Sequence, residues 1–209
     1  MLAGIEPSQS LHFPAEDCLG TEIAAARARE YALLAALLTR APSREFLEAI
    51  AELKVDASPL GLAHAALAEA ARLARPEDVE REFFDLFIGI GRGELVPYGS
   101  YYLSGFLYER PLARLRADLG ELGIVRSEGN CEPEDHIATL CEIMAGLAGG
   151  EFSSPAGADE QFFRKHVEPW AGRFFADLEH AQAARFYGSV GTLGRTFIEI
   201  ESEAYALPA

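Results

Sequence analysis

Apolar side chains recur every three or four residues over most of this 209-residue chain. The clearest run lies near the C-terminus and comprises Phe186, Val190, Leu193, Phe197, Ile200 and Ala204. Steps that alternate between four and three residues place side chains on one face of an α-helix. No segment shows the period-two alternation, bounded by hairpin turns, that a half-buried strand requires. The chain is therefore expected to fold as an all-α protein of about eight to ten helices.

Capping residues and prolines mark the helices of the N-terminal half. Thr21 and Ser43 have side chains that cap helices, and the first of these helices is expected to run to about Arg40. A third, alanine-rich helix is expected over 58–74, and Pro76 suits the first turn of a fourth. The end of the fourth helix is expected to pack heavily through its large apolar residues, which are Phe83, Phe84, Leu86, Phe87 and Ile88.

Glycine, proline and polar segments divide the C-terminal half. Four glycines and a proline break the helical pattern over 89–100, and helical spacing resumes over 103–122. A further helix is expected over 132–147. Asp159 begins another helical stretch, which Pro169 is expected to kink or break.

The helical pattern indicates a single globular domain over 21–209. Residues 1–20 mix Pro, Ser, Glu and Asp and are expected to be loosely ordered. The polar loop at 126–131 is expected to divide the helices softly into two lobes.

Acidic residues dominate the charge. Thirty-three Asp and Glu against 18 Lys and Arg give a net charge of −15, while 49% of the residues are hydrophobic. Such a surface repels phosphate backbones, so nucleic acid is a poor partner. A basic peptide or a basic protein segment is a better one. In the alternative interpretation the acidic residues only keep the protein soluble, and the net charge taken alone favours this interpretation.

Cysteine usage and the N-terminus indicate a cytoplasmic protein. The three cysteines, Cys18, Cys131 and Cys141, are odd in number and have no zinc-site spacing. Residues 1–20 lack a basic segment followed by an apolar core, so no secretory signal is expected. The longest notable apolar run, 31–38, is too short to span a bilayer.

The segment Glu132-Pro133-Glu134-Asp135-His136 carries more charge than a helix start needs. Pro133 is tolerated in a first helical turn, and the three carboxylates would sit at the positive end of the helix dipole. Asp135 could bind an arginine through both oxygens. In the alternative interpretation Glu134 and Asp135 only cap the helix and His136 is half-buried. The residues alone leave these two interpretations open.

Catalytic and metal-binding patterns are missing. Asp135 and His136 are adjacent, so on a helix they point about 100° apart and cannot chelate one metal together. A His–Asp dyad would need a nucleophile, and none of Ser100, Cys131 and Cys141 has supporting spacing. His136, His166 and His180 lie outside any HExxH motif.

The glycines and tyrosines that follow residue 88 are interpreted as structural. Gly89, Gly91 and Gly93 lack the lysine and hydroxyl of a phosphate-binding loop, which favours a helix C-cap and a tight loop. Tyr98 and its neighbours could recognise a peptide. This segment taken alone favours a loop pinned to the core, with Ser100 capping the next helix.

Three separated motifs carry a family resemblance. The first covers 82–89 (EFFDLFIG) and 97–102 (PYGSYY), the second is 132–136 (EPEDH), and the third covers 166–170 (HVEPW) and is followed by Phe186-Tyr187 and the last helix. With these motifs in order, the chain resembles the TorD/DmsD/NarJ family of cytoplasmic chaperones for molybdenum-containing redox enzymes.

The resemblance implies an all-α protein that binds a partner and is not an enzyme. Family members hold the twin-arginine signal peptide, or another part of the apoprotein, of a molybdoenzyme until its cofactor is inserted, and thereby proofread it before export. No cofactor of the chaperone itself is implied, although weak guanine nucleotide binding stays open. Members occur as monomers or as dimers that exchange lobes. Neither nucleic acid binding nor stable membrane insertion is expected.

The resemblance also assigns candidate peptide-binding residues. Those from the first motif are Leu86, Phe87, Tyr98 and Ser100, and those from the second are Glu132, Asp135 and His136. Tyr98 stands where some relatives have tryptophan, which alters that contact. We hypothesise that Glu132 and Asp135 bind the leader arginines. We also hypothesise that Phe87, Tyr98 and Tyr102 line a groove for the apolar run that follows.

Two rival functions are considered. One is a nucleotide hydrolase that uses the glycine loop or a hydrolase that uses His136, and the missing lysine and nucleophile motifs argue against both. The other is an assembly factor for a molybdoenzyme of the nitrate-reductase type, which is not exported and has no twin-arginine leader. A leader-binding test would separate this assembly factor from the chaperone of an exported enzyme.

Overall fold

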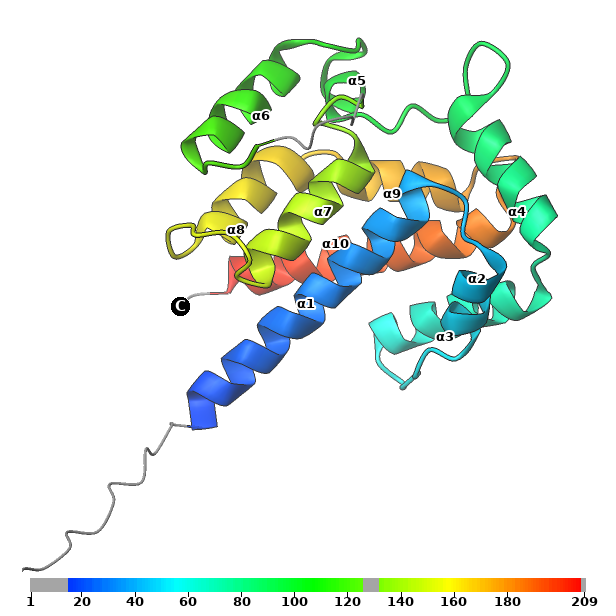
Figure 1. Cartoon of the computed structure of the whole chain (residues 1–209), viewed down its shortest axis with the longest axis horizontal. Coiled ribbons are helices and arrows are strands. Elements are labelled where there is room, and N and C mark those ends of the chain that lie inside the picture. The colour runs from blue at the N-terminus through cyan, green and yellow to red at the C-terminus, as the bar shows by residue number, and fades with distance from the viewer. Residues whose placement is uncertain (1–14, 126–131, 208–209) are drawn as a thin grey trace, which may run out of the picture.

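The computed structural model describes residues 15–125 and 132–207, and the side chains from residue 20 on (Figure 1). This part of the chain contains ten α-helices, two short π-helical segments and no strand. The first half comprises α1 (Ala15–Thr39), α2 (Arg44–Ala51), α3 (Pro59–Leu73), α4 (Pro76–Phe83), η1 (Phe84–Ile88), α5 (Gly99–Ser104) and α6 (Arg110–Glu121). The second half comprises α7 (Ile137–Ala148), α8 (Ala158–Phe162), η2 (Phe163–Val167), α9 (Ala171–Glu179) and α10 (Phe186–Ala206). The predicted all-α fold is confirmed.

The core lies between five helices. α1 packs along α7, α9 packs along α10, and α3 packs against α10 (Figure 1). The apolar face expected on α10 is buried at Phe186, Val190, Leu193 and Phe197. The Tyr31 ring of α1 meets Phe197 edge-on, with centroids 4.7 Å apart. Each such buried large side chain stabilises the fold by about 1.5–3 kcal/mol, so burial of this kind holds the five helices together.

A buried carboxylate on α10 joins this helix to α1. Glu201 on α10 is 2% exposed, yet both of its oxygens accept hydrogen bonds. The Arg27 guanidinium donates to Oε1 and Oε2 at 2.8 and 2.9 Å, and the Tyr31 hydroxyl donates to Oε2 at 2.9 Å. The charge is therefore paired and solvated by the protein, as a buried carboxylate requires.

The predicted helix boundaries are confirmed at several positions. The Ser43 hydroxyl oxygen accepts the Phe46 N–H at 3.3 Å and caps α2. Pro76 opens α4, and Pro169 falls in the turn that separates η2 from α9. Cys141 is a buried core thiol, and burial raises its pKa. Cys131 and the loop at 126–131 lie outside the described residues.

Three expectations about the helices are corrected. α1 begins at Ala15, six residues before Thr21, so Thr21 lies inside the helix and is not its cap. The helix expected over 103–122 is divided between the end of α5 and α6, because α5 ends at its C-cap Gly105, which has φ 83°. The end of the fourth helix winds more widely as η1, and this leaves Phe84 and Ile88 40% and 54% exposed.

Candidate functional site

The Glu132–His136 segment is a turn that precedes α7 and is not the first turn of that helix. The His136 N–H donates to the Pro133 carbonyl at 3.1 Å, and α7 begins at Ile137. His136 is the N-cap residue, and its Nδ1 accepts the Ala138 N–H at 3.2 Å. The expectation of a helix from residue 132 was wrong, because the backbone of this segment pairs with residues 97 and 99 and α7 begins only at Ile137.

Backbone pairing fastens this turn to the start of α5. The Gly99 N–H donates to the Asp135 carbonyl, and the Ile137 N–H donates to the Pro97 carbonyl, both at 2.9 Å. These bonds form one isolated antiparallel bridge between Tyr98 and His136. The first and second sequence motifs are thereby brought into contact.

Asp135 is buried and links the turn at 132–136 to α5. It is 3% exposed, and its Oδ2 accepts the Ser100 N–H at 2.7 Å. Its Oδ1 and the Ser100 Oγ are buried without a hydrogen-bond partner among the described residues. An unpaired buried carboxylate oxygen is costly, and an incoming N–H donor would relieve that cost.

The exposed Glu132 lies against the half-buried Tyr98 and His136 on one side of the turn. The Tyr98 hydroxyl donates to Glu132 Oε2 at 2.5 Å, and the Tyr98 ring meets the imidazole edge-on at 5.1 Å. Burial and the Glu132 carboxylate raise the pKa of Tyr98. Burial lowers the pKa of His136 despite the nearby Glu132 and Asp135 carboxylates. A neutral imidazole is the form that can accept the Ala138 N–H at Nδ1.

The third motif packs beneath α5. The Trp170 indole N–H donates to the His166 carbonyl at 2.8 Å, and the Tyr102 ring lies 5.3 Å from the Trp170 ring. Gly99 lies against the indole so closely that a Cβ there would stand 3.0 Å from Nε1. The three motifs therefore meet around α5.

The candidate peptide-binding residues divide among three hollows and the core. Phe87, Tyr98, Glu132 and His136 line a hollow of ≈ 190 Å³. Asp135 lines a larger one of ≈ 670 Å³, together with Gly99 and Trp170. Tyr102 lines a third hollow of ≈ 430 Å³. Leu86 and Ser100 are both fully buried. The expectation that Ser100 caps the next helix was wrong, because α5 begins at Gly99 and its N-cap residue is Tyr98.

Two glutamates that the sequence analysis did not single out hold the α9–α10 connection. Glu82 accepts the backbone N–H groups of residues 185, 186 and 187 at 2.6–3.1 Å and caps α10. Glu94 accepts those of residues 182 and 183 at 2.6 and 2.9 Å. The available signal for Glu82 was a charge on the apolar face of α4, three residues after the buried Val79.

The glycine segment is a tight loop, as interpreted from the sequence. Gly89 and Gly91 have φ values of 60° and 89°, which favour glycine. A Cβ on Gly93 would stand 2.5 Å from the Leu86 carbonyl oxygen, and the Leu95 N–H donates to that oxygen at 2.8 Å. Within the described residues no cluster of three metal-binding side chains occurs. None of the described helices has the length and hydropathy to span a membrane.

Comparison with known proteins places the chain in a family. A family model described as nitrate reductase delta subunit matches residues 53–176, which is more than half of the chain and includes all eight candidate residues. The chain belongs to this family. The resemblance to TorD/DmsD/NarJ proteins is thereby confirmed.

Curated members of the nitrate reductase delta subunit family include similar chaperones. The chaperone protein TorD of Vibrio cholerae serotype O1 El Tor is 30% identical over 141 residues, which cover 61% of this chain and 64% of that protein. TorD of Vibrio vulnificus CMCP6 is 24% identical over 200 residues, covering 85% and 93%. The relatives are named chaperones and not enzymes, in agreement with the expectation of a non-catalytic protein.

A solved structure shows the same fold. A protein from Archaeoglobus fulgidus, described as a redox enzyme maturation protein, matches with a TM-score of 0.58 and 20% identity. The match covers 92% of this chain and 99% of that one. The overall arrangement of the helices is therefore that of a known fold.

Proposed function

We propose that this protein is a cytoplasmic chaperone for a molybdenum-cofactor oxidoreductase. It binds the twin-arginine signal peptide, the apoprotein, or both, and assists cofactor insertion and proofreading before export. It carries no cofactor of its own, although weak guanine nucleotide binding stays open, and it acts as a monomer or a lobe-exchanged dimer. Family membership and the relatives named TorD support the chaperone role.

The acidic turn at 132–136 is the observation that best supports leader binding. Glu132 is exposed beside the ≈ 190 Å³ hollow, and Asp135 offers a buried, unpartnered oxygen at the ≈ 670 Å³ hollow. A carboxylate can accept a guanidinium through two parallel hydrogen bonds, which suits the exposed Glu132. Asp135 offers Oδ1 for a single hydrogen bond, because its Oδ2 already accepts the Ser100 N–H. In a chain whose net charge is −15, the same turn would attract a basic leader on approach.

The division of the carboxylates between two hollows matches the chemistry of paired arginines. Successive side chains of an extended peptide point to opposite sides. A leader that crosses the turn in an extended conformation can therefore direct one arginine toward Glu132 and the next toward Asp135. Phe83, Phe87 and Ile88 line the smaller hollow and supply apolar contacts for the run that follows the arginines.

Isothermal titration calorimetry with a synthetic leader tests this function. The probe carries two adjacent arginines and an apolar run of about 15 residues, and the full chain is titrated as wild type and as Glu132→Gln. Glutamine keeps an acceptor for the Tyr98 hydroxyl but removes the charge. We expect about tenfold weaker binding, since a charge-assisted hydrogen bond contributes roughly 1.5–3 kcal/mol.

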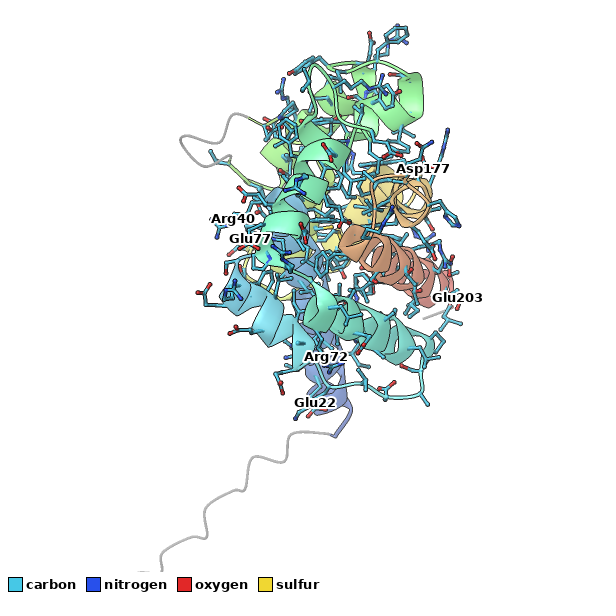
Figure 2. All side chains as sticks on the ribbon, turned by 90° about the vertical axis from the view of Figure 1, so that its right-hand side faces the viewer. Glu22, Arg40, Arg72, Glu77, Asp177 and Glu203 are labelled. Atoms are coloured by element: carbon cyan, nitrogen blue, oxygen red, sulfur yellow. The ribbon has the colours of Figure 1, made fainter. Side chains whose placement is uncertain are left out.

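Glu203→Gln is the matched control, because Glu203 is an exposed carboxylate on α10, far from the turn (Figure 2). A second control replaces the two leader arginines by lysines, which keep the charge but lose the bidentate geometry. If Glu132→Gln and Glu203→Gln bind the leader with equal affinity, Glu132 is not part of the binding site. Equal binding by the lysine leader would refute bidentate arginine recognition.

An assembly factor for a non-exported molybdoenzyme is the second candidate. The family description, nitrate reductase delta subunit, favours it. This function requires binding to the N-terminal segment of a cytoplasmic enzyme and none to a twin-arginine leader. Failure of every leader in calorimetry, with binding to an enzyme N-terminus that lacks paired arginines, would select this candidate.

A further inference from the structure

The ≈ 190 Å³ hollow beside the acidic turn is lined by a second glutamate, Glu142 of α7. Ala138, Thr139 and Glu142 form its α7 wall, because residues three and four apart lie on one face of a helix. Glu132 and His136 line it from the turn, and residues at the ends of α1 and α4, in η1 and before α5 complete the lining. Glu142 is exposed, so an incoming ligand can reach its carboxylate.

Glu142 forms no ion pair or hydrogen bond with any residue that the structure describes. The exposed Arg40 follows Thr39 in the sequence but does not line the hollow. Partial burial raises the pKa of Glu142, and no described cation near it lowers that pKa. The charged form of Glu142 is therefore disfavoured in this structure, and a bound cation would stabilise it.

No lysine or arginine is among the described residues that line this hollow. By contrast, the hollows of ≈ 670, ≈ 660, ≈ 430 and ≈ 240 Å³ are each lined by at least one. Burial lowers the pKa of His136, so its imidazole adds no positive charge near neutral pH. Burial and Glu132 raise the pKa of Tyr98, so its hydroxyl stays neutral. The described charged groups of this hollow therefore select a cationic occupant.

Aromatic rings form much of the apolar part of the hollow. The Phe83 and Phe87 rings lie 5.0 Å apart, and Phe87 meets Tyr187 edge-on at 5.5 Å, which holds both phenylalanines in place. The hydrogen bond to Glu132 fixes the Tyr98 ring in the same way. An arginine packs its aliphatic stem on such a surface and stacks its planar guanidinium on aromatic rings, whereas the ammonium of lysine is compact and strongly hydrated. Arginine is therefore the cation that this hollow fits best.

We propose that Glu142 is a specificity-determining residue for leader binding, and that it shares with Glu132 the one leader arginine that enters the ≈ 190 Å³ hollow. This inference rests on the proposed function. A guanidinium has five N–H donors, so it can donate to Glu142 and to Glu132 while the Tyr98 hydroxyl keeps its own bond to Glu132. The other arginine is left to Asp135, which offers a single oxygen. The two arginine positions of the leader are consequently unequal, because two carboxylates recognise one position and one oxygen recognises the other.

Isothermal titration calorimetry with three leaders tests this inequality. One leader carries both arginines, and each of the others has citrulline in place of one arginine, which keeps the shape and removes the charge. The full chain is titrated as wild type and as Glu142→Gln, and we expect the variant to bind the unmodified leader about fivefold or more weakly. With citrulline at the position that enters the hollow, this loss should fall below about twofold, because the two changes remove the same interaction. Citrulline at the other position should leave the loss intact.

Glu151→Gln is the matched control, because Glu151 is an exposed glutamate that follows the far end of α7 and does not line the hollow. We expect less than about a twofold effect on leader binding. Glu132→Gln should lose its effect with the same citrulline leader as Glu142→Gln does. Dependence of the two glutamates on different citrulline positions would overturn the shared arginine. Equal affinity of wild type and Glu142→Gln for the unmodified leader would overturn the role of Glu142.

A small probe separates failure of this inference from failure of the proposed function. N-acetyl-arginine N-methylamide is added to the isotope-labelled full chain, and the backbone amide resonances of Ala138 and Thr139 on the α7 wall are followed by NMR. If no leader binds, saturable shifts that the citrulline analogue does not cause and that Glu142→Gln abolishes would support the arginine site while refuting leader binding. Absence of such shifts would overturn the arginine site as well.

Discussion

The Arg27–Glu201 cluster and the 132–136 turn both bury a carboxylate, but they satisfy it differently. Glu201 is 2% exposed, and each of its oxygens has a donor from Arg27. Asp135 is 3% exposed and keeps one oxygen without a partner among the described residues. In the Arg27–Glu201 cluster every carboxylate oxygen has a donor, so this cluster stabilises the fold and offers no site for a further donor. The turn retains unused hydrogen-bonding capacity beside a hollow, which is typical of a site that awaits a ligand.

The largest expected effect breaks the complete cluster. Arg27→Ala leaves Glu201 buried without its counter-charge and should lower the free energy of unfolding by about 3 kcal/mol or more. Arg116→Ala, which removes the 2.8 Å pair with Glu134 at the turn, should cost less than about 1 kcal/mol, because the arginine side chain is 52% exposed. Urea unfolding followed by circular dichroism measures both values. Similar decreases in the free energy of unfolding of Arg27→Ala and Arg116→Ala would contradict the distinction between the cluster and the turn.

A smaller effect is expected at Asp135. Asp135→Ala removes the acceptor of the Ser100 N–H and should cost about 1–3 kcal/mol, whereas Asp135→Asn keeps an acceptor and should cost less. Leader affinity in calorimetry should fall in both, because the charge is lost in both. If Asp135→Asn keeps its stability and its affinity for the leader, Asp135 has a structural role only.

The smallest effect is a change in pH dependence. The pKa of folded His136 lies below the ordinary value of 6.5 because the ring is buried. The unfolded chain therefore takes up a proton first, so the stability contribution of His136 is complete above about pH 6.5 and declines as the pH falls below that value. His136→Asn keeps a capping acceptor for Ala138 but does not titrate, and it should flatten the loss of stability between about pH 7 and about pH 5.

Urea unfolding at several pH values measures this slope. His166 contributes a residual slope of the same sign, because burial also lowers its pKa. His64 contributes in the opposite direction, since its hydrogen bond to Glu30 raises its pKa. An unchanged slope in His136→Asn would show that His136 is not the titrating group.

Local signals in the sequence were sufficient for much of the fold. Ser43, Pro76 and Pro169 act through neighbouring residues, and each was placed correctly. The α10 stripe was correct from Phe186 to Phe197, but Ile200 is only half-buried and Ala204 is exposed. The 132–136 segment was misassigned because a proline suits both the first turn of a helix and a turn before one. What decided between them was pairing with Pro97 and Gly99, about 35 residues away.

The sequence predicted which segments form the candidate site, but not which of their side chains are exposed. The motifs indicated which segments matter, and they do meet around α5. Periodicity could not show that Leu86 and Ser100 are fully buried while Ile90, four residues after Leu86, is 99% exposed. The width of η1 and the tight glycine loop set these exposures, and both depend on backbone conformations that many sequences can adopt.

The two glutamates that hold the α9–α10 connection provide a direct spectroscopic readout. Five backbone amides, at residues 182, 183, 185, 186 and 187, donate to carboxylates that flank the glycine loop. Amide protons bonded in this way exchange slowly with deuterium as long as the loop keeps its position. Hydrogen-exchange mass spectrometry of this short peptide would therefore report any displacement of the loop when a ligand binds, without a label on either molecule.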